Sequence, residues 1–367
     1  MSFLLLLLIL VQDLDAQTPS PSPSASKPTV KTVPPSQTLS PSARPQESDE
    51  EDVVRVNTTL VTVPVSVMDR NGKYILDLRR EDFHLYEDGA EQDIANFDST
   101  EKPFTVALLL DISDSMRFRI EDIQAAATVF VNQLRQEDRV MVIAFDSQLR
   151  ILTETTTNHN LARDAIRRTS IGAGTRVYDA INFVLNQRFK SIRGRKAVIL
   201  FTDGVDTGSF QASFKDNQRD AEESDVLIYP VQYSTSKDLN DQLRAGLSSP
   251  SGGSVMLPSG NGAGNVDTAR AGSYLRALSQ KTGARLYRVD DAQDLTRSFI
   301  RIAGELRQQY SLSYYPKVPA QSGQRREIKV HINGPGLLVR ARGSYIAGTT
   351  EIRQHPRQDA MPRLRKQ

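Results

Sequence analysis

Four short and almost uninterrupted apolar stretches in the middle of the chain constrain its fold more than any other feature. They begin at Phe104, Arg139, Lys196 and Val226 and read FTVALLLD, RVMVIAFDS, KAVILFTDG and VLIYPVQYS. Strands without a polar face are buried on both sides, which is typical of a parallel sheet covered by helices. We therefore expect these stretches to be strands of one buried, parallel sheet.

The segments between and after these stretches have the apolar spacing of helices. Apolar residues recur at intervals of three and four in RIEDIQAAATVFVNQLRQ, NLARDAIRRT, RVYDAINFVLNQRF, SYLRALSQKTG and AQDLTRSFIRIAGELRQQ. Strands that alternate with helices indicate an α/β fold. The sequence thus predicts a doubly wound, mostly parallel, Rossmann-like domain over residues 103–308.

Strand patterns of a different kind flank this domain on both sides. Val and Thr alternate in VNTTLVTVPVSV, and the pairs Asn71-Gly72 and Asp88-Gly89 are hairpin-turn signals. Residues 51–102 hold too few strands to form a sandwich alone, and a similar pattern returns in residues 309–347. We predict that the two blocks form one small β-sandwich, with the α/β domain inserted in it or flanked by it.

The ends of the chain are predicted to lie outside both domains. Residues 1–16 hold one short apolar stretch, well below the roughly 20 residues of a membrane span, which suits a signal peptide despite the lack of a preceding Lys or Arg. A buried strand or a misplaced start codon is the alternative. Residues 17–50, rich in Pro and Ser, predict a disordered linker, and residues 348–367 a basic tail. We expect a secreted protein, or one of the periplasm or cell envelope, without a stable membrane span.

Composition and motifs exclude several function classes. The net charge of +2 is spread without a basic stripe, which argues against nucleic acid as a partner, and the absence of cysteine excludes disulfides and thiolate chemistry. The four histidines lack metalloprotease spacing, and no phosphate-binding glycine loop, dinucleotide fingerprint or serine-hydrolase elbow is present. We therefore expect no enzyme.

Polar side chains gather where the predicted strands end. Asp111, Ser113 and Ser115 follow the first strand, Asp203 follows the third, and Thr175 lies in the glycine-rich stretch GAGTRVYDA. Ligands of doubly wound sheets bind at the carboxyl ends of the strands, and carboxylate and hydroxyl oxygens suit Mg²⁺, Mn²⁺ or Ca²⁺. Ordinary helix caps and turns are the alternative explanation of each motif alone.

This set resembles the metal-ion-dependent adhesion site of the von Willebrand factor type A domain, whose pattern is Asp-x-Ser-x-Ser, then Thr, then Asp. The resemblance covers roughly residues 104–308 and implies a metal site made of Asp111, Ser113, Ser115, Thr175 and Asp203. It further implies a bound Mg²⁺ (or Mn²⁺ or Ca²⁺) with one open position, which an exposed Asp or Glu of a protein partner fills. The flanking blocks resemble those of a bacterial, Acidobacteria-like group of such proteins. Asp114 stands where the family often has Gly, and we expect it to add charge at the rim or to cap the next helix.

These observations predict an exported, divalent-metal-dependent module for protein binding and adhesion. A metal-dependent hydrolase or phosphotransfer enzyme using Asp111 is the alternative, although Ser113 stands where such an enzyme carries its acid–base carboxylate. A purely structural envelope protein is a further one. We also expect residues 246–272, rich in Gly and Ser, to form a loop at the rim of the site. The helix near residues 294–308 is predicted to shift when the site is occupied.

Overall fold

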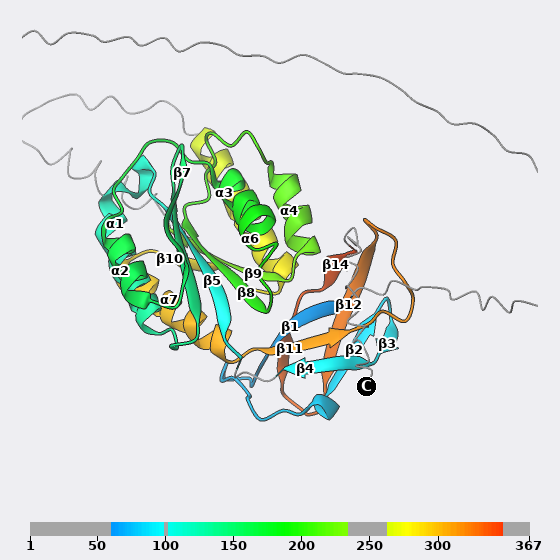
Figure 1. Cartoon of the computed structure of the whole chain (residues 1–367). Coiled ribbons are helices and arrows are strands. Elements are labelled where there is room, and N and C mark those ends of the chain that lie inside the picture. The colour runs from blue at the N-terminus through cyan, green and yellow to red at the C-terminus, as the bar shows by residue number, and fades with distance from the viewer. Residues whose placement is uncertain (1–59, 99–101, 234–262, 348–367) are drawn as a thin grey trace, which may run out of the picture. The chain divides into compact units, whose positions relative to one another are not determined.

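The computed structural model of the chain (Figure 1) describes residues 60–98, 102–233 and 263–347. The predicted signal peptide, linker and basic tail lie outside these residues. Within the described ranges, no helix combines the length and the apolar character that crossing a membrane requires.

The centre of the α/β region is a six-stranded sheet in the order β10-β9-β8-β5-β6-β7. All neighbouring strands are parallel except β6 and β7, which are antiparallel. The predicted α/β fold with a mostly parallel sheet is therefore confirmed. The strands are β5 (Phe104–Asp111), β6 (Arg139–Phe145), β7 (Leu149–Thr156), β8 (Arg195–Thr202), β9 (Val226–Tyr233) and β10 (Tyr287–Val289).

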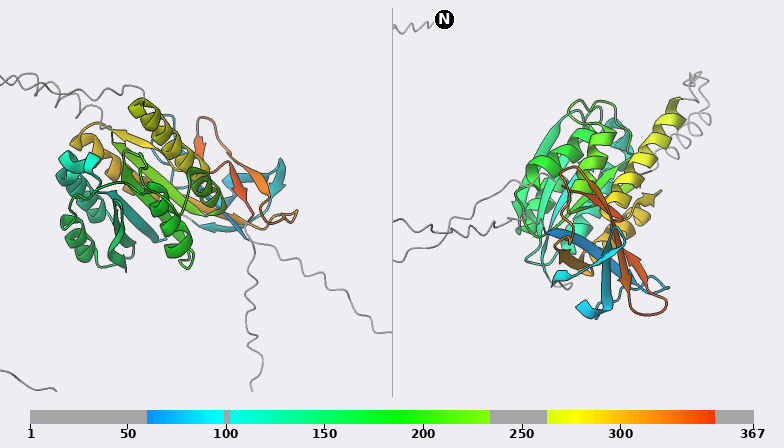
Figure 2. Two further views of the ribbon diagram at one scale, coloured as in Figure 1. Left: turned by 90° about the horizontal axis from the view of Figure 1, so that it is seen from above. Right: turned by 90° about the vertical axis from the view of Figure 1, so that its right-hand side faces the viewer.

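Helices cover both faces of this sheet (Figures 1 and 2). Helices α1, α2 and α7 pack on one face, where Val106 and Leu108 of β5 point, and α3, α4 and α6 pack on the other, with Ala107 and Leu109. Because successive side chains of a strand point to opposite faces, the apolar run of β5 supplies both cores. The helices are α1 (Ile120–Asn132), α2 (His159–Arg167), α3 (Val177–Phe183), α4 (Phe214–Glu223), α6 (Ala263–Thr282) and α7 (Ala292–Arg307).

The flanking blocks pair with each other in two four-stranded sheets, β13-β1-β11-β4 and β14-β12-β2-β3. Each sheet combines strands from before and after the α/β region, and apolar residues of both sheets, among them Val63, Leu85, Leu312 and Ile328, share one core. The strands are β1 (Val61–Met68), β2 (Phe83–Glu87), β3 (Ala90–Gln92), β4 (Ile94–Asp98), β11 (Tyr310–Tyr314), β12 (Arg325–Ile332), β13 (Leu338–Arg340) and β14 (Ser344–Ile346).

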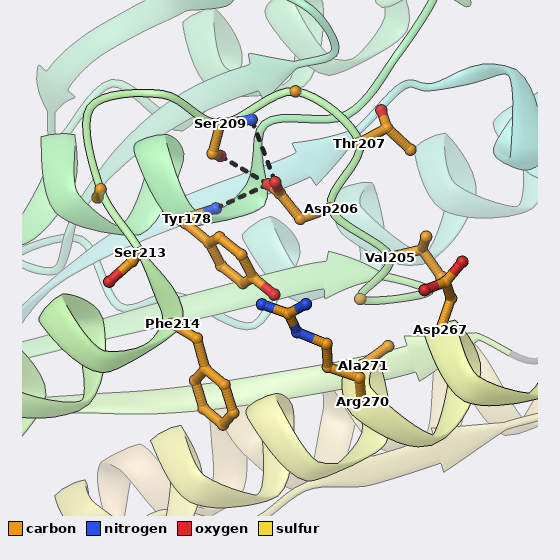
Figure 3. Close-up of a pocket in the computed structure, with 13 residues that line it drawn as sticks. Tyr178, Val205, Asp206, Thr207, Ser209, Ser213, Phe214, Asp267, Arg270 and Ala271 are labelled. Carbon is orange, nitrogen blue, oxygen red and sulfur yellow. Dashed lines mark hydrogen bonds between the residues drawn. The ribbon is translucent and has the colours of Figure 1, made fainter. Parts of the chain in front are cut away.

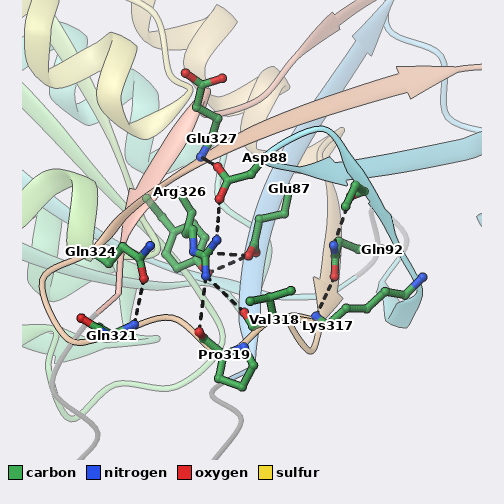
Figure 4. Close-up of polar contacts among 12 residues, drawn as sticks. Glu87, Asp88, Gln92, Lys317, Val318, Pro319, Gln321, Gln324, Arg326 and Glu327 are labelled. Atoms are coloured by element: carbon green, nitrogen blue, oxygen red, sulfur yellow. Dashed lines mark hydrogen bonds and ion pairs between the residues drawn. The ribbon is translucent and has the colours of Figure 1, made fainter.

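A buried carboxylate helps to hold these two sheets together. Glu87 accepts hydrogen bonds from the hydroxyls of Tyr314, at 2.5 Å, and Tyr345, at 3.2 Å. Next to it, Asp88 pairs with Arg326 at 2.6 Å and occupies the β2–β3 turn with a φ of 47° (Figure 4). Asp88 and Gly89 both have positive φ, as a tight hairpin turn requires.

Two further buried carboxylates tie the flanking sheets to the α/β region. Glu305 of α7 accepts hydrogen bonds from Tyr74, at 3.0 Å, and Tyr229, at 2.9 Å, and pairs with Arg340 of β13. Glu222 of α4 pairs with Arg325 of β12 at 2.8 Å. Because a buried charge is costly unless it is paired, these contacts fix the junction between the two parts.

Several local predictions were incomplete or wrong. Helix α4 and the antiparallel edge strand β7 were not predicted. The expected loop 246–272 is wrong for Ala263–Gly272, which form the first turns of α6, and its remainder lies outside the described residues. The glycines of this stretch lower its helix propensity, but α6 packs its Ala271 and Leu275 against Gly204, and tertiary packing of this kind overrides propensity.

Candidate metal centre

Asp111 is the last residue of β5, and its carboxylate is fully buried. One carboxylate oxygen accepts a hydrogen bond from the Ser113 N–H at 3.0 Å, and the other accepts one from the Thr202 hydroxyl at 2.6 Å. Strands β5 and β8 are neighbours in the sheet, which is why Thr202 reaches Asp111. The carboxylate therefore has a fixed orientation at the end of the strand.

The two serines lie in the turn that follows β5. Ser113 is buried and Ser115 is exposed, and their hydroxyl oxygens are 3.1 Å apart. Ser113 precedes the short helix η2 (Asp114–Arg119), yet its side chain makes no capping hydrogen bond. Capping, the ordinary explanation of this motif, therefore does not account for the position of the Ser113 hydroxyl. Asp114 does not cap a helix either, because its exposed carboxylate pairs with Arg117 at 2.5 Å.

Asp203 follows β8 directly and lies at the same edge of the sheet. Its side chain accepts hydrogen bonds from the Val205 N–H, at 2.9 Å, and from the Ser115 hydroxyl. Gly204, with a φ of 85°, allows the chain to turn here, and helix α6 packs so closely that a Cβ at this position would lie 2.8 Å from Leu275. Hydrogen bonds thus connect Asp111, Ser113, Ser115 and Asp203 in sequence.

Thr175 is buried in a loop whose backbone forms hydrogen bonds with residues that follow β5, β6 and β8. The N–H of Gly172 donates to the Ile112 carbonyl at 2.7 Å, and the Ser147 N–H donates to the Ala173 carbonyl at 2.9 Å. The N–H of Thr175 donates to the Thr207 hydroxyl at 2.8 Å. The structure therefore brings the backbone of this loop to the Asp111 and Asp203 turns, which places all five predicted residues at one edge of the sheet. Their roles as ligands stay a prediction.

Two residues that position this site were not predicted. Thr202 donates to Asp111 and accepts from the Gly204 N–H at 2.9 Å, so it links the two turns. Gly172 lies against Asp146, because a Cβ there would be 1.6 Å from the Asp146 carboxylate. The sequence signal for Thr202 was its place in FTDG at a strand end. Nothing in the sequence indicated the contact of Gly172.

The two buried carboxylates repel each other. Burial and, to a smaller extent, the charge of Asp203 raise the pKa of Asp111 to about 7, against the hydrogen bonds from Ser113 and Thr202. Burial also raises the pKa of Asp203, against the hydrogen bonds from Val205 and Ser115.

Neither carboxylate has a cationic side chain within ion-pair distance in the part of the chain that the structure describes. The described residues contain no cluster of three or more His, Cys, Asp or Glu that could hold a metal. The donor set is instead two carboxylates with hydroxyls, which fits a hard divalent cation.

A cavity of about 340 Å³ opens beside the Asp203 turn (Figure 3). Gly204 and Val205 form one side, Tyr178 and Phe214 supply aromatic surface, and the guanidinium of Arg270 points toward the Tyr178 hydroxyl. The pKa of Tyr178 is raised, chiefly by burial. This cavity forms a recess at the edge of the sheet, beside the Asp203 turn.

The loop between β8 and α4 is held by one buried carboxylate. Asp179 accepts N–H hydrogen bonds from Phe210, Gln211 and Ala212 at 3.2, 2.9 and 2.9 Å. Phe210 itself is 68% exposed, and the Arg176 guanidinium lies 4.6 Å from the centre of its ring. A large apolar side chain is therefore displayed on a fixed loop, next to the residue that follows Thr175.

Part of the sequence matches the model of a known family. Residues 106–205 match the family model of the von Willebrand factor type A domain. The matched segment contains all five predicted site residues. Domains of this family typically mediate protein–protein interaction or adhesion.

Individual proteins similar to this chain were found as well. An uncharacterized protein of Synechocystis sp. is 31% identical over 106 residues, which are 28% of this chain and 25% of the relative, so the chain matches about a quarter of that protein. A solved von Willebrand factor type A structure from Catenulispora acidiphila has 11% identity and a TM-score of 0.43, covering 80% of this chain and 75% of that one. The von Willebrand factor domain of the type V pili tip protein Mfa5 from Porphyromonas gingivalis has 12% identity and a TM-score of 0.42, covering 55% and 94%.

Proposed function

We propose that this chain is an exported, non-enzymatic module that binds a protein partner through a divalent cation. The cation, Mg²⁺ or alternatively Mn²⁺ or Ca²⁺, is held by five side chains at the carboxyl edge of the sheet: Asp111, Ser113, Ser115, Thr175 and Asp203. Its open coordination position takes an exposed Asp or Glu of the partner.

The observation that carries this proposal is the pair of buried carboxylates without a cationic partner. Asp111 and Asp203 are 0% and 7% exposed and come from the ends of neighbouring strands. Two buried negative charges at one place are strongly unfavourable unless a positive charge compensates them. A divalent cation provides that compensation, and the hydroxyls of Ser113 and Ser115 are neutral ligands that leave the charge balanced.

The ion supplies a positive charge that a partner's carboxylate can bind directly. The five side chains leave one position of an octahedral coordination shell open. Water or a carboxylate of the partner fills that position. The surroundings then select the partner. Phe210 offers apolar area on a loop that is already ordered by Asp179, which lowers the entropic cost of binding. The cavity beside Asp203 offers a second surface that the partner can contact.

The position of the site suits display to a partner outside the cell. The flanking sheets contact the α/β region near the first residues of β5 and β8, where Phe104 and Arg195 lie. The proposed ion site is at the opposite ends of the same two strands, beyond Asp111 and Thr202. This arrangement leaves the ion edge free of the chain's own flanking sheets.

Selection from a random peptide library tests the proposal without a known partner. Peptides displayed on phage are captured by the immobilised chain in Mg²⁺ and released with EDTA. We expect the released pool to be enriched in Asp or Glu, and the enrichment to be lost with Asp203→Ala. The matched control is Asp114→Asn, an exposed carboxylate in the same region, which should behave like wild type. A pool without acidic enrichment, or equal capture in EDTA, would refute the proposal.

A further inference from the structure

A second polar cavity, of about 380 Å³, lies where the flanking sheets meet the starts of the parallel strands. Five cationic and two carboxylate side chains line it, which leaves an excess of three positive charges. Lys102 pairs with Asp98 at 2.5 Å and Lys196 pairs with Asp225 at 2.8 Å. The cationic side chains that remain are three arginines: Arg139, Arg193 and Arg195.

Within the described ranges, none of these three arginines has a carboxylate partner. Arg195 is instead held by two backbone carbonyls, with its guanidinium 2.8 Å from the Lys102 oxygen and also bonded to the Leu306 oxygen. Its guanidinium lies 6.0 Å from the centre of the Phe104 ring. Burial lowers the pKa of Arg195, while the negative charges of Asp138 and Asp98, both beyond ion-pair distance, act against that shift. A guanidinium held in this way keeps further N–H donors for a ligand.

Neutral polar groups complete the lining of the cavity. Gln309, only 3% exposed, lines it and makes no side-chain hydrogen bond to any residue that the structure describes. The hydroxyls of Thr62 and Ser313 lie 3.0 Å apart, so only one of their two protons is used between them. The Gln309 side-chain amide is not among the fully buried groups without a partner, so it is open to water or a ligand in the cavity.

We propose that this cavity is a binding site for a multivalent anion, separate from the ion edge of the sheet. Two exposed arginines and Arg195, none of which has an ion-pair partner among the described residues, together with the Gln309 amide and one free hydroxyl proton, are donors that bind phosphate or clustered carboxylates. The volume accommodates a small ligand. The ligand class is therefore a small free anion that carries phosphate groups or clustered carboxylates.

Inorganic pyrophosphate serves as the probe, measured by calorimetry with the full chain in EDTA so that no divalent cation complexes it. We expect saturable binding to wild type and a loss of about tenfold in affinity for Arg139→Ala/Arg193→Ala. Gln309→Met, which changes no charge, should weaken binding as well. The control Arg168→Ala/Arg276→Ala removes two exposed arginines outside the cavity and should stay near wild type.

The proposal is overturned if wild type binds pyrophosphate no more tightly than Arg139→Ala/Arg193→Ala, or if the control variant loses as much affinity as the cavity variant. Because the assay contains no divalent ion, its result is independent of the proposed metal site.

Discussion

Replacing Asp111 by Asn should stabilise the ion-free protein and abolish its response to Mg²⁺. The substitution keeps the size of the side chain and one oxygen that can accept the hydrogen bond from Thr202. It loses the acceptor of the Ser113 N–H and removes a negative charge from a fully buried position. In the absence of a cation this charge has only hydroxyl and backbone N–H partners and the repulsion of Asp203. The charge is therefore a cost to the fold until an ion binds.

The size of the effect follows from the pKa. Because burial raises the pKa of Asp111 from 3.8 to about 7, the folded state holds the proton more tightly than the unfolded state. The free energy of unfolding of ion-free wild type therefore falls as pH rises from about 4 to 7. The full difference is about 4 kcal/mol, at 1.36 kcal/mol per pKa unit, and we expect a net gain of about 1–3 kcal/mol because the variant loses the hydrogen bond from the Ser113 N–H.

Thermal unfolding of both proteins at pH 5 and pH 8, in EDTA and in Mg²⁺, measures this effect. At pH 8 in EDTA, Asp111→Asn should melt several degrees above wild type, with a smaller difference at pH 5. Mg²⁺ at 100 times its Kd should stabilise wild type by about 2.7 kcal/mol and leave the variant unchanged. The reasoning is wrong if the variant is less stable than wild type at pH 8 in EDTA, or if Mg²⁺ stabilises both equally.

Three further predictions concern the supports of the site and the junction. Gly172→Ala should destabilise the fold by about 1–3 kcal/mol in urea unfolding and weaken Mg²⁺ binding, because the new Cβ would lie 1.6 Å from the Asp146 oxygen that pairs with Arg150; unchanged stability would show that the loop has room. Asp179→Asn should speed hydrogen exchange of the Phe210 amide about tenfold, since an amide offers one acceptor oxygen where the carboxylate uses two, and equal exchange would contradict this. Glu222→Gln should cost about 2 kcal/mol at pH 7. Burial acts to raise the pKa of Glu222, yet hydrogen bonds from its partners lower it overall. The contribution of Glu222 to the free energy of unfolding is therefore full above pH 4.5 and is lost as the pH falls below that value. A difference in stability between variant and wild type that persists at pH 3 would refute this role of the Glu222 charge.

The parallel strands were predictable because burial on both faces leaves a direct mark in the sequence. Leu108 and Leu109 point to different cores, so FTVALLLD does not alternate between apolar and polar residues. Helix α4 left no such mark, because its buried side includes Asn217, Asp220 and Glu222 and its only fully apolar buried residue is Ala221. Its one usable signal was the capping box of Ser213 and Asp216.

The candidate site was predictable where its residues share a strand end and not where they act through the backbone. Asp111 and Asp203 each follow an apolar run, so the rule that strand ends gather at one edge was enough to bring them together. The contact between Gly172 and Asp146 depends on how a loop crosses two strands, and no local pattern encodes that. The role of Thr202 as a link between the two carboxylate turns likewise requires the register of β5 and β8.

Calorimetric titration of the full chain with Mg²⁺ tests the central claim most directly. We predict one binding site per chain for wild type, the same site for Asp114→Asn, and no measurable binding for Asp203→Ala at equal protein concentration. Binding that persists unchanged in Asp203→Ala, or no binding of Mg²⁺, Mn²⁺ or Ca²⁺ to folded wild type, would contradict a cation held between the two strand ends.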